Sequence, residues 1–145
     1  MIVAYALMLS MQIASSPEPL PPVETYEFLT DKDDTCIKDA PDCHQMSEPR
    51  LFRGTWRFAF EGSMLTPPGK IDCEEAGSDV PCMWLDGDDL PWAGKGDCRA
   101  YEVEFVGRRS LHPGFYRGAA FEVVVDRLIS AKRLPNPEGS WCSGE

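Results

Sequence analysis

Residues 52–61 of the chain read FRGTWRFAFE, and this stretch decides the class of fold. Its alternate positions separate into a mostly aromatic set and a mostly polar set. The first set is Phe52, Gly54, Trp56, Phe58 and Phe60, and the second is Arg53, Thr55, Arg57, Ala59 and Glu61. Alternation of this kind, with aromatic enrichment, predicts a β-strand with one buried face. We expect Trp56 in the core and Arg57 exposed to water, because a slip of one residue would exchange the two faces.

Similar alternation recurs further along the chain. It covers Cys98–Val106 and Ala119–Leu134, and shorter runs at Lys70–Cys73 and Cys82–Asp86 are possible strands. In the last long pattern the phase is lost at 127–129, which predicts a β-bulge or a sharp bend. After the first residues no segment has the apolar spacing of a helix, apart from a possible short turn near 124–129. The chain is therefore predicted to be mainly β.

The length of 145 residues suits one domain. The strand patterns define a domain at residues 50–134, followed by a C-terminal tail at 135–145. So small a core is expected to close on itself, because an open sheet would leave its edges exposed. We predict an OB-like five-stranded barrel, with a small β-sandwich as the alternative. Disulfides commonly supplement cores of this size.

The N-terminal residues of the chain predict that the protein is exported. No charged side chain precedes Glu18, and residues 1–14 are almost entirely apolar, a length that suits a signal peptide rather than a membrane span. Small residues follow, so we expect a signal peptide at 1–16 and a mature chain that starts near Ser16 or Pro17. The alternative is an uncleaved interfacial or anchor helix. The predicted location is periplasmic or secreted.

Cysteine usage supports the same compartment. An even number of cysteines in a short exported chain predicts a disulfide framework. The six are Cys36, Cys43, Cys73, Cys82, Cys98 and Cys142. Proximity favours the pairs 36–43 and 73–82, which leaves 98–142, although six thiols allow 15 pairings. A soft metal site at Cys43-His44-Gln45-Met46 is the alternative use of one cysteine, and we expect no cofactor.

Charge is distributed unevenly. The chain has 24 acidic and 14 basic residues, for a net charge of −10. Residues 17–49 carry nine acids and two bases, and they read as a disordered, acidic, proline-rich linker with a small Cys loop. Residues 71–97 carry eight acids and one base. Such a protein is repelled by phosphate backbones, so nucleic acid is not an expected partner, whereas a cationic envelope or secreted protein is.

No set of residues predicts catalysis. The two histidines, His44 and His112, lie in the acidic linker and in a Pro-Gly turn, and a Ser–His–acid site needs a positioned histidine. Three acids gather at Asp86, Asp88 and Asp89, but they do not match a calcium-binding loop and read as a solvated hairpin loop. A weak hydrolase built on these acids is kept as a further alternative.

The candidate binding residues are basic and aromatic, as in the polymer-binding grooves of OB barrels. They are Arg108, Arg109, Tyr116 and Trp92. The simpler interpretation pairs the arginines with acids of neighbouring strands, namely Glu102, Glu104, Glu122 and Asp126.

Three stretches also carry a resemblance to a group of proteins. They are FVGRRS at 105–110, HPGFY at 112–116 and VDRLIS at 125–130, preceded by CMWL at 82–85. They resemble the C-terminal part of uncharacterised exported bacterial proteins with an OB-like fold. The resemblance covers about 50 of the 145 residues. It implies a location in the cell envelope, and it implies no particular activity. The function we expect is therefore a non-enzymatic, protein-binding domain of the cell envelope, and the alternative is a periplasmic protein that binds a small ligand or a metal.

Overall fold

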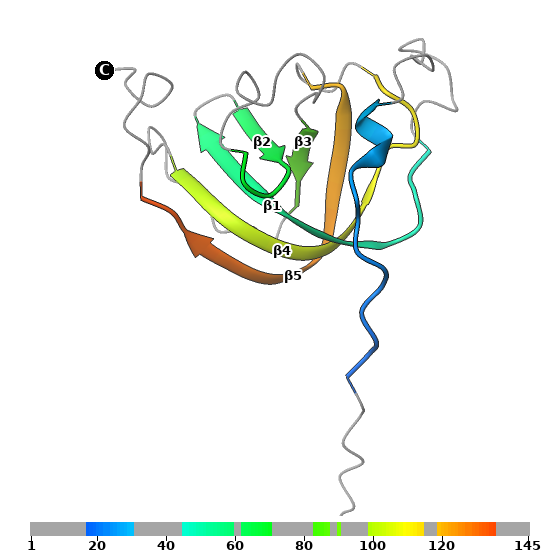
Figure 1. The fold of residues 1–145 in the computed structure, drawn as a ribbon, viewed down its shortest axis with the longest axis horizontal. Coiled ribbons are helices and arrows are strands. Elements are labelled where there is room, and N and C mark those ends of the chain that lie inside the picture. Colours follow the sequence, from blue (N-terminus) through cyan, green and yellow to red (C-terminus); the bar gives the residue numbers. More distant parts are fainter. Residues whose placement is uncertain are drawn as a thin grey trace, which may run out of the picture.

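The computed structural model describes residues 17–30, 45–59, 62–70, 83–87, 90, 99–114 and 119–135 (Figure 1). Its elements are the 3-10 helix η1 (Glu27–Thr30) and the strands β1 (Arg50–Ala59), β2 (Gly62–Thr66), β3 (Met83–Asp86), β4 (Arg99–Arg109) and β5 (Phe121–Arg133). The strands form a closed barrel in the order β1-β2-β3-β5-β4. The prediction of a mainly β, five-stranded barrel is confirmed, and the alternative of a β-sandwich is wrong.

The pairing of the strands explains how the barrel closes. β1 pairs with β4 along residues 50–58 and with β2 along residues 55–59, so only its second half has a strand on each side. β3 pairs with β2 in antiparallel and with β5 in parallel orientation. β4 and β5 form the long curved ribbon that spans the lower side of Figure 1.

Alternate side chains of these strands fill the barrel. Phe52 and Phe105 stack with ring centroids 5.2 Å apart, and Trp56 stacks on Tyr101 at 5.3 Å. Trp56 is only 2% exposed, so the prediction that it lies in the core is confirmed. The aromatic face of the sequence pattern is thus the inner face of β1.

The prediction for Arg57 is wrong. This residue points away from the core, as the alternation indicates, yet it is only 8% exposed. It lies opposite Met64 on β2 and Ala100 on β4, in the half of β1 that has neighbours on both edges. Alternation predicts the face on which a side chain lies, but it does not predict whether that face is covered.

Two glycines allow close approach where β1 and β4 bend. A Cβ on Gly54 would lie 2.4 Å from the carbonyl oxygen of Thr66, and one on Gly107 would lie 2.4 Å from that of Val124. Real Cβ atoms essentially never come so close to a backbone oxygen. The strands can therefore curve this tightly only with glycine at these positions.

The bulge predicted near 127–129 is confirmed. The register between β4 and β5 shifts between Glu104 and Phe105 and again between Val106 and Gly107. Opposite these two steps, Ile129 and Asp126 have no partner on β4. Extra residues of this kind bend and twist a strand, which suits a ribbon that wraps around the barrel.

The sequence reading missed β2. The alternation at 52–61 predicts a single strand, whereas the chain turns at its end and Gly62–Thr66 returns antiparallel to β1. Met83–Asp86 confirms the short run predicted at Cys82–Asp86. Of the other predicted short run, Lys70–Cys73, all but Lys70 lies outside the described residues.

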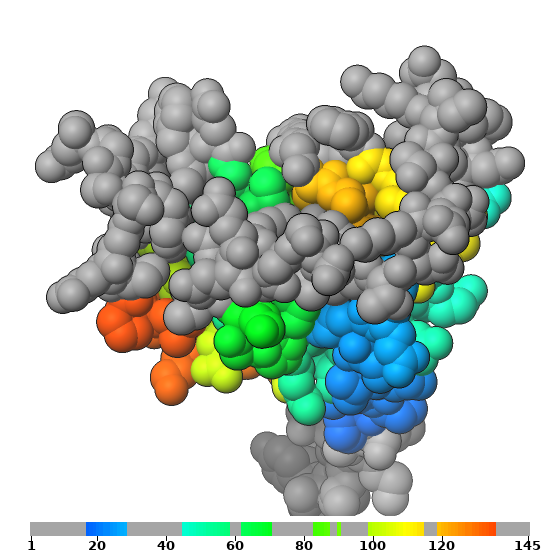
Figure 2. Space-filling model, turned by 45° about the horizontal axis from the view of Figure 1, so that its top comes forward, coloured from blue at the N-terminus to red at the C-terminus, as the bar shows by residue number. Residues whose placement is uncertain are grey.

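The expectation of a disordered linker does not hold for residues 22–28 and 45–47. The amide of Glu24 donates to the carbonyl of Leu51 at 2.8 Å, and the amide of Leu51 donates to that of Pro22 at 2.9 Å. Ser47 donates from its amide to the carbonyl of Arg109 at 2.8 Å. Figure 2 shows the blue N-terminal residues lying against the barrel, beside the cyan start of β1.

The N-terminal segment also adds two aromatic rings to the core. Tyr26 and Phe28 pack against the buried cluster, and the Phe28 ring meets that of Phe121 edge-on at 5.0 Å. Tyr26 has a φ of 61° and its hydroxyl donates to the carbonyl oxygen of Arg53 at 2.5 Å. This left-handed residue turns the chain from the edge of β1 into η1, so the domain includes residues before 50.

Several predictions lie outside the described residues. They are the signal peptide at 1–16, all six cysteines with their pairing, and the tail from residue 136. Within the described ranges no helix is long and apolar enough to cross a membrane.

Candidate functional site

The buried polar groups inside the barrel form hydrogen bonds with one another. The indole nitrogen of Trp56 donates to Oγ of Ser63, and this Oγ donates to the carbonyl of Leu85. Thr66, which is buried opposite Thr55 on the other face of the strands, donates from its hydroxyl to the carbonyl of Lys70 at 2.6 Å. Groups that recognise a partner must therefore be sought on the outside of the described strands.

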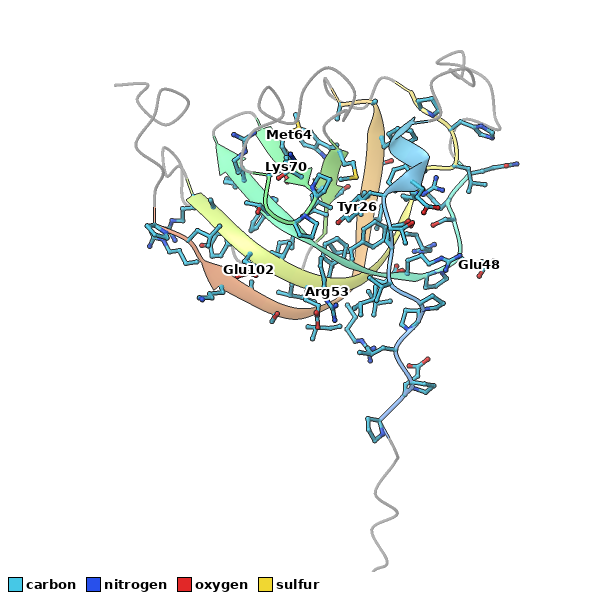
Figure 3. All side chains as sticks on the ribbon, viewed as in Figure 1. Tyr26, Glu48, Arg53, Met64, Lys70 and Glu102 are labelled. Carbon is cyan, nitrogen blue, oxygen red and sulfur yellow. The ribbon has the colours of Figure 1, made fainter. Side chains whose placement is uncertain are left out.

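A hollow of about 650 Å³ lies on the outer side of β1, β4 and β5. We call it the outer groove and define it by Arg53, Thr55, Glu102, Glu104, Ser130 and Lys132. Pro68 and Gly69, in the turn after β2, form a wall, and Gly54, Val103 and Leu134 add apolar lining. Figure 3 shows Arg53 and Glu102 toward the lower border of the strands, below Tyr26.

Strand register arranges the groove in two rows across the sheet. In one row Arg53 lies opposite Glu104, which lies opposite Ser130. In the other row Thr55 lies opposite Glu102, which lies opposite Lys132. Each row thus brings together side chains that are between 26 and 77 residues apart in sequence, at the close spacing of cross-strand pairs.

Among the described residues, the charged side chains are paired with each other in one row and unpaired in the other. Nε of Arg53 lies 2.5 Å from Oε2 of Glu104, so these two charges hold one another. Glu102 and Lys132 are both exposed, and neither has an ion pair or a hydrogen bond within the described residues. The groove therefore offers one fixed ion pair and, beside it, one carboxylate and one ammonium that are available to a ligand.

Arg108, a predicted binding residue, lines a second hollow. This hollow, of about 730 Å³, lies between the N-terminal segment and the β4–β5 ribbon, and Glu18, Pro19, Asp126 and Arg127 also line it. The Arg108 guanidinium binds the Asp126 carboxylate through Nε at 2.9 Å and Nη2 at 2.6 Å. The predicted cross-strand pairing is confirmed here, and this ion pair raises the pKa of Arg108.

Arg109, the next predicted binding residue, fastens the N-terminal segment. Its guanidinium carbon lies 3.9 Å from the centre of the Phe28 ring, and its Nε lies 3.7 Å from Oε2 of Glu24. Burial lowers its pKa, an effect that Glu24 opposes. Arg109 is half-buried and holds the segment against the barrel.

The other predicted binding residues, Tyr116 and Trp92, lie outside the described residues, as do His44, Asp88 and Asp89. Asp86 is exposed at the end of β3. Across the part of the chain that the structure covers, no three His, Cys, Asp or Glu side chains gather as metal ligands. Arg108 is paired with Asp126 in the second hollow, whereas Arg109 lies against the N-terminal segment. The two predicted arginines therefore do not form one site.

The excess of acidic over basic residues does not lie in the described part of the chain. The described residues contain nine acids and ten bases, whereas the remaining residues contain 15 acids and four bases. The barrel surface that can be described is therefore nearly neutral. The negative charge belongs chiefly to the segments at 31–44 and 71–98.

Sequence reasoning missed the outer groove as a site. The alternation of β4 does place Glu102 and Glu104 on its outer face, and that signal is correct, whereas the loss of phase at 127–129 left Lys132 without a predicted face. The wall at Pro68 and Gly69 could not be anticipated, because β2, which positions it, was not predicted.

Comparison with protein-family models, with curated proteins and with solved structures finds no match to this chain.

Proposed function

We propose that this chain is an exported, non-enzymatic interaction domain, and that it binds a protein partner through the outer groove. The observation that carries the proposal is the pair Glu102 and Lys132. Two exposed opposite charges stand side by side on neighbouring strands without bonding to each other, next to the half-buried Leu134. A protein surface supplies both complementary charges and apolar contact, the usual mixture at an interface.

The arrangement of strands supports an OB-like assignment within this proposal. β1 pairs with both β2 and β4, and β3 runs parallel to β5. OB barrels present ligand-binding surfaces on the outside of the strands and in adjoining loops, while side chains fill the interior. The packed rings of Phe52, Trp56 and Phe105 in this barrel agree with binding on the outside.

Export and the framework of three disulfides remain part of the proposal. They rest on the apolar residues 1–14 and on six cysteines that all follow this leader. A cationic partner remains proposed on the same basis, because the acid-rich segments at 31–44 and 71–98 would attract it and raise its rate of association.

A charge exchange tests the role of the groove. We would exchange the two groove charges in the double variant Glu102→Lys/Lys132→Glu. This variant keeps the net charge and the cross-strand complementarity, so it should fold with unchanged stability. Glu48→Lys/Arg50→Glu makes the same exchange at two exposed residues outside the groove and serves as the control.

The readout is the partner retained by each immobilised protein from an envelope extract of the native cell, at low and at high salt. We expect the wild type and the control to retain the same protein at low salt, and the groove variant to lose it. Equal retention by all three would show that the groove is not the binding surface.

A further inference from the structure

Among the described residues, the outer edge of β5 has no partner strand along much of its length. β3 pairs with β5 only along residues 121–124. From Val125 to Arg133 β5 pairs with β4 on one side, and no strand among the described residues pairs with the other side. In Figure 1 this part of β5 forms the lower border of the described strands. A strand edge of this kind presents backbone N–H and C=O groups that another chain can bind.

Both hollows of the outer surface reach this edge. β5 contributes Ser130 and Lys132 to the outer groove and contributes Asp126 and Arg127 to the second hollow. A strand added beside β5 would therefore direct alternate side chains towards two recessed surfaces. Peptides that bind by strand addition gain affinity from the backbone and specificity from such recesses.

The charges on β5 indicate which kind of added strand this edge would bind. Arg127, Lys132 and Arg133 are exposed on β5, and none of them has an ion pair or hydrogen bond with another described residue. The acid on this stretch, Asp126, is held by Arg108. Because β5 thus presents only positive charge at its edge, a second copy of β5 would meet like charges, whereas an acidic strand would meet opposite ones.

We propose that the open edge of β5 takes up one extended, acidic segment of the partner, which is otherwise cationic, as an additional antiparallel strand. Its carboxylates would lie beside Arg127 and Lys132. The proposal rests on the proposed function and names the class of segment that the domain recognises. The bulges at Asp126 and Ile129 limit the regular stretch of the edge to residues 130–133, so recognition depends strongly on the flanking charges.

The test uses the mature chain and two synthetic probes. One is a short peptide in which glutamate alternates with threonine, and the other is the matched peptide with lysine in place of glutamate. Backbone amide signals of the isotope-labelled protein are followed by NMR during each titration. We expect the acidic peptide to shift the amides of 127–133 and slow their hydrogen exchange, and the lysine peptide to leave them unchanged.

Charge reversal provides the matched variants. Arg127→Glu/Lys132→Glu should weaken binding of the acidic peptide by about tenfold or more, because two favourable cross-strand pairs become repulsive. Arg50→Glu/Lys70→Glu changes the net charge equally at exposed residues outside β5 and should bind like the wild type. If both variants bind the acidic peptide equally weakly, net charge alone explains the loss of affinity, and the proposal is overturned.

Failure of this proposal can be separated from failure of the proposed function. If neither peptide shifts the β5 amides, the bases and bulges serve only to protect the edge, and strand addition is wrong. If the groove variant then still loses the native partner, the interaction domain stands. If the acidic peptide binds β5 while the groove variant keeps the native partner, the groove assignment fails instead.

Discussion

The indole Nε1 of Trp56 on β1 donates a hydrogen bond to Oγ of Ser63 on β2, at a distance of 2.9 Å. Ser63 in turn donates to the carbonyl oxygen of Leu85 on β3, 2.6 Å away. Three consecutive strands of the barrel are thus joined by one buried polar chain. The inner face of β1 is therefore defined by a specific polar contact as well as by aromatic burial.

Ser63→Ala tests this relationship. The substitution leaves the buried indole N–H and the Leu85 carbonyl without their hydroxyl partner, and an unsatisfied buried group costs about 1–3 kcal/mol. Chemical unfolding should show a loss of this size, whereas Ser130→Ala, at an exposed position, should stay within about 0.5 kcal/mol. In a Trp56→Phe background the penalty of Ser63→Ala should shrink. Additive losses would show that the two side chains are not coupled.

Gly54→Ala tests the close approach between β1 and β2. The new Cβ would lie 2.4 Å from the Thr66 carbonyl oxygen and 2.9 Å from Cδ1 of Leu65, so backbone must move. We expect a destabilisation of about 1–3 kcal/mol, as for other overpacked cores. Gly62→Ala is the control, because its Cβ would meet nothing within 4 Å. Equal melting temperatures for the two variants would contradict the bend at Gly54.

Phe28→Ala tests whether the N-terminal segment belongs to the domain. The ring packs on Phe121 and under the Arg109 guanidinium, so its removal should cost about 1.5–3 kcal/mol of apolar burial. Leu20→Ala, on the same segment but 52% exposed, should have little effect on the thermal melt. A flexible linker would predict no difference between the two variants, and that result would exclude the docked segment.

The Tyr26 hydroxyl predicts a loss of stability in alkali. Burial, and secondarily Glu24, raises the pKa of Tyr26 above the ordinary tyrosine value of 10.0. The folded chain therefore keeps a proton that the unfolded chain releases above about pH 10, so the free energy of unfolding should fall as the pH rises from there, by at most about 1.4 kcal/mol per pH unit. Urea titrations between about pH 9 and 11 should show a shallower fall for Tyr26→Phe. Identical slopes would mean that Tyr26 is not the group responsible.

Much of the barrel could be predicted because its long strands carry a strict alternation. Phe52 and Trp56 on one face of β1, and Glu102 and Glu104 on the outer face of β4, were assigned correctly from period alone. The phase change near Leu128 also predicted the bulge. These features are local in sequence, and local patterns are what alternation reports.

The features that could not be predicted depend on contacts between distant segments. β2 was not predicted because its sequence, GSMLT, has one β-branched residue and no aromatic residue to indicate a strand. Arg57 is buried although it lies on the outer face, and the docking of Tyr26 and Phe28 depends on a core that is formed by residues later in the chain. An acidic, proline-rich composition concealed this docking, because composition describes a whole segment and two aromatic rings are enough to anchor part of it.

The central claim, that the outer groove is the surface that binds the partner, is tested most directly by cross-linking in the native cell. A photoreactive amino acid would replace Glu102 in the groove or, as the control, the exposed Gln45 outside both hollows. After irradiation, the account predicts a single discrete adduct with one envelope protein from position 102 and none from position 45. An adduct of equal yield from both positions, or one from position 45 alone, would contradict it.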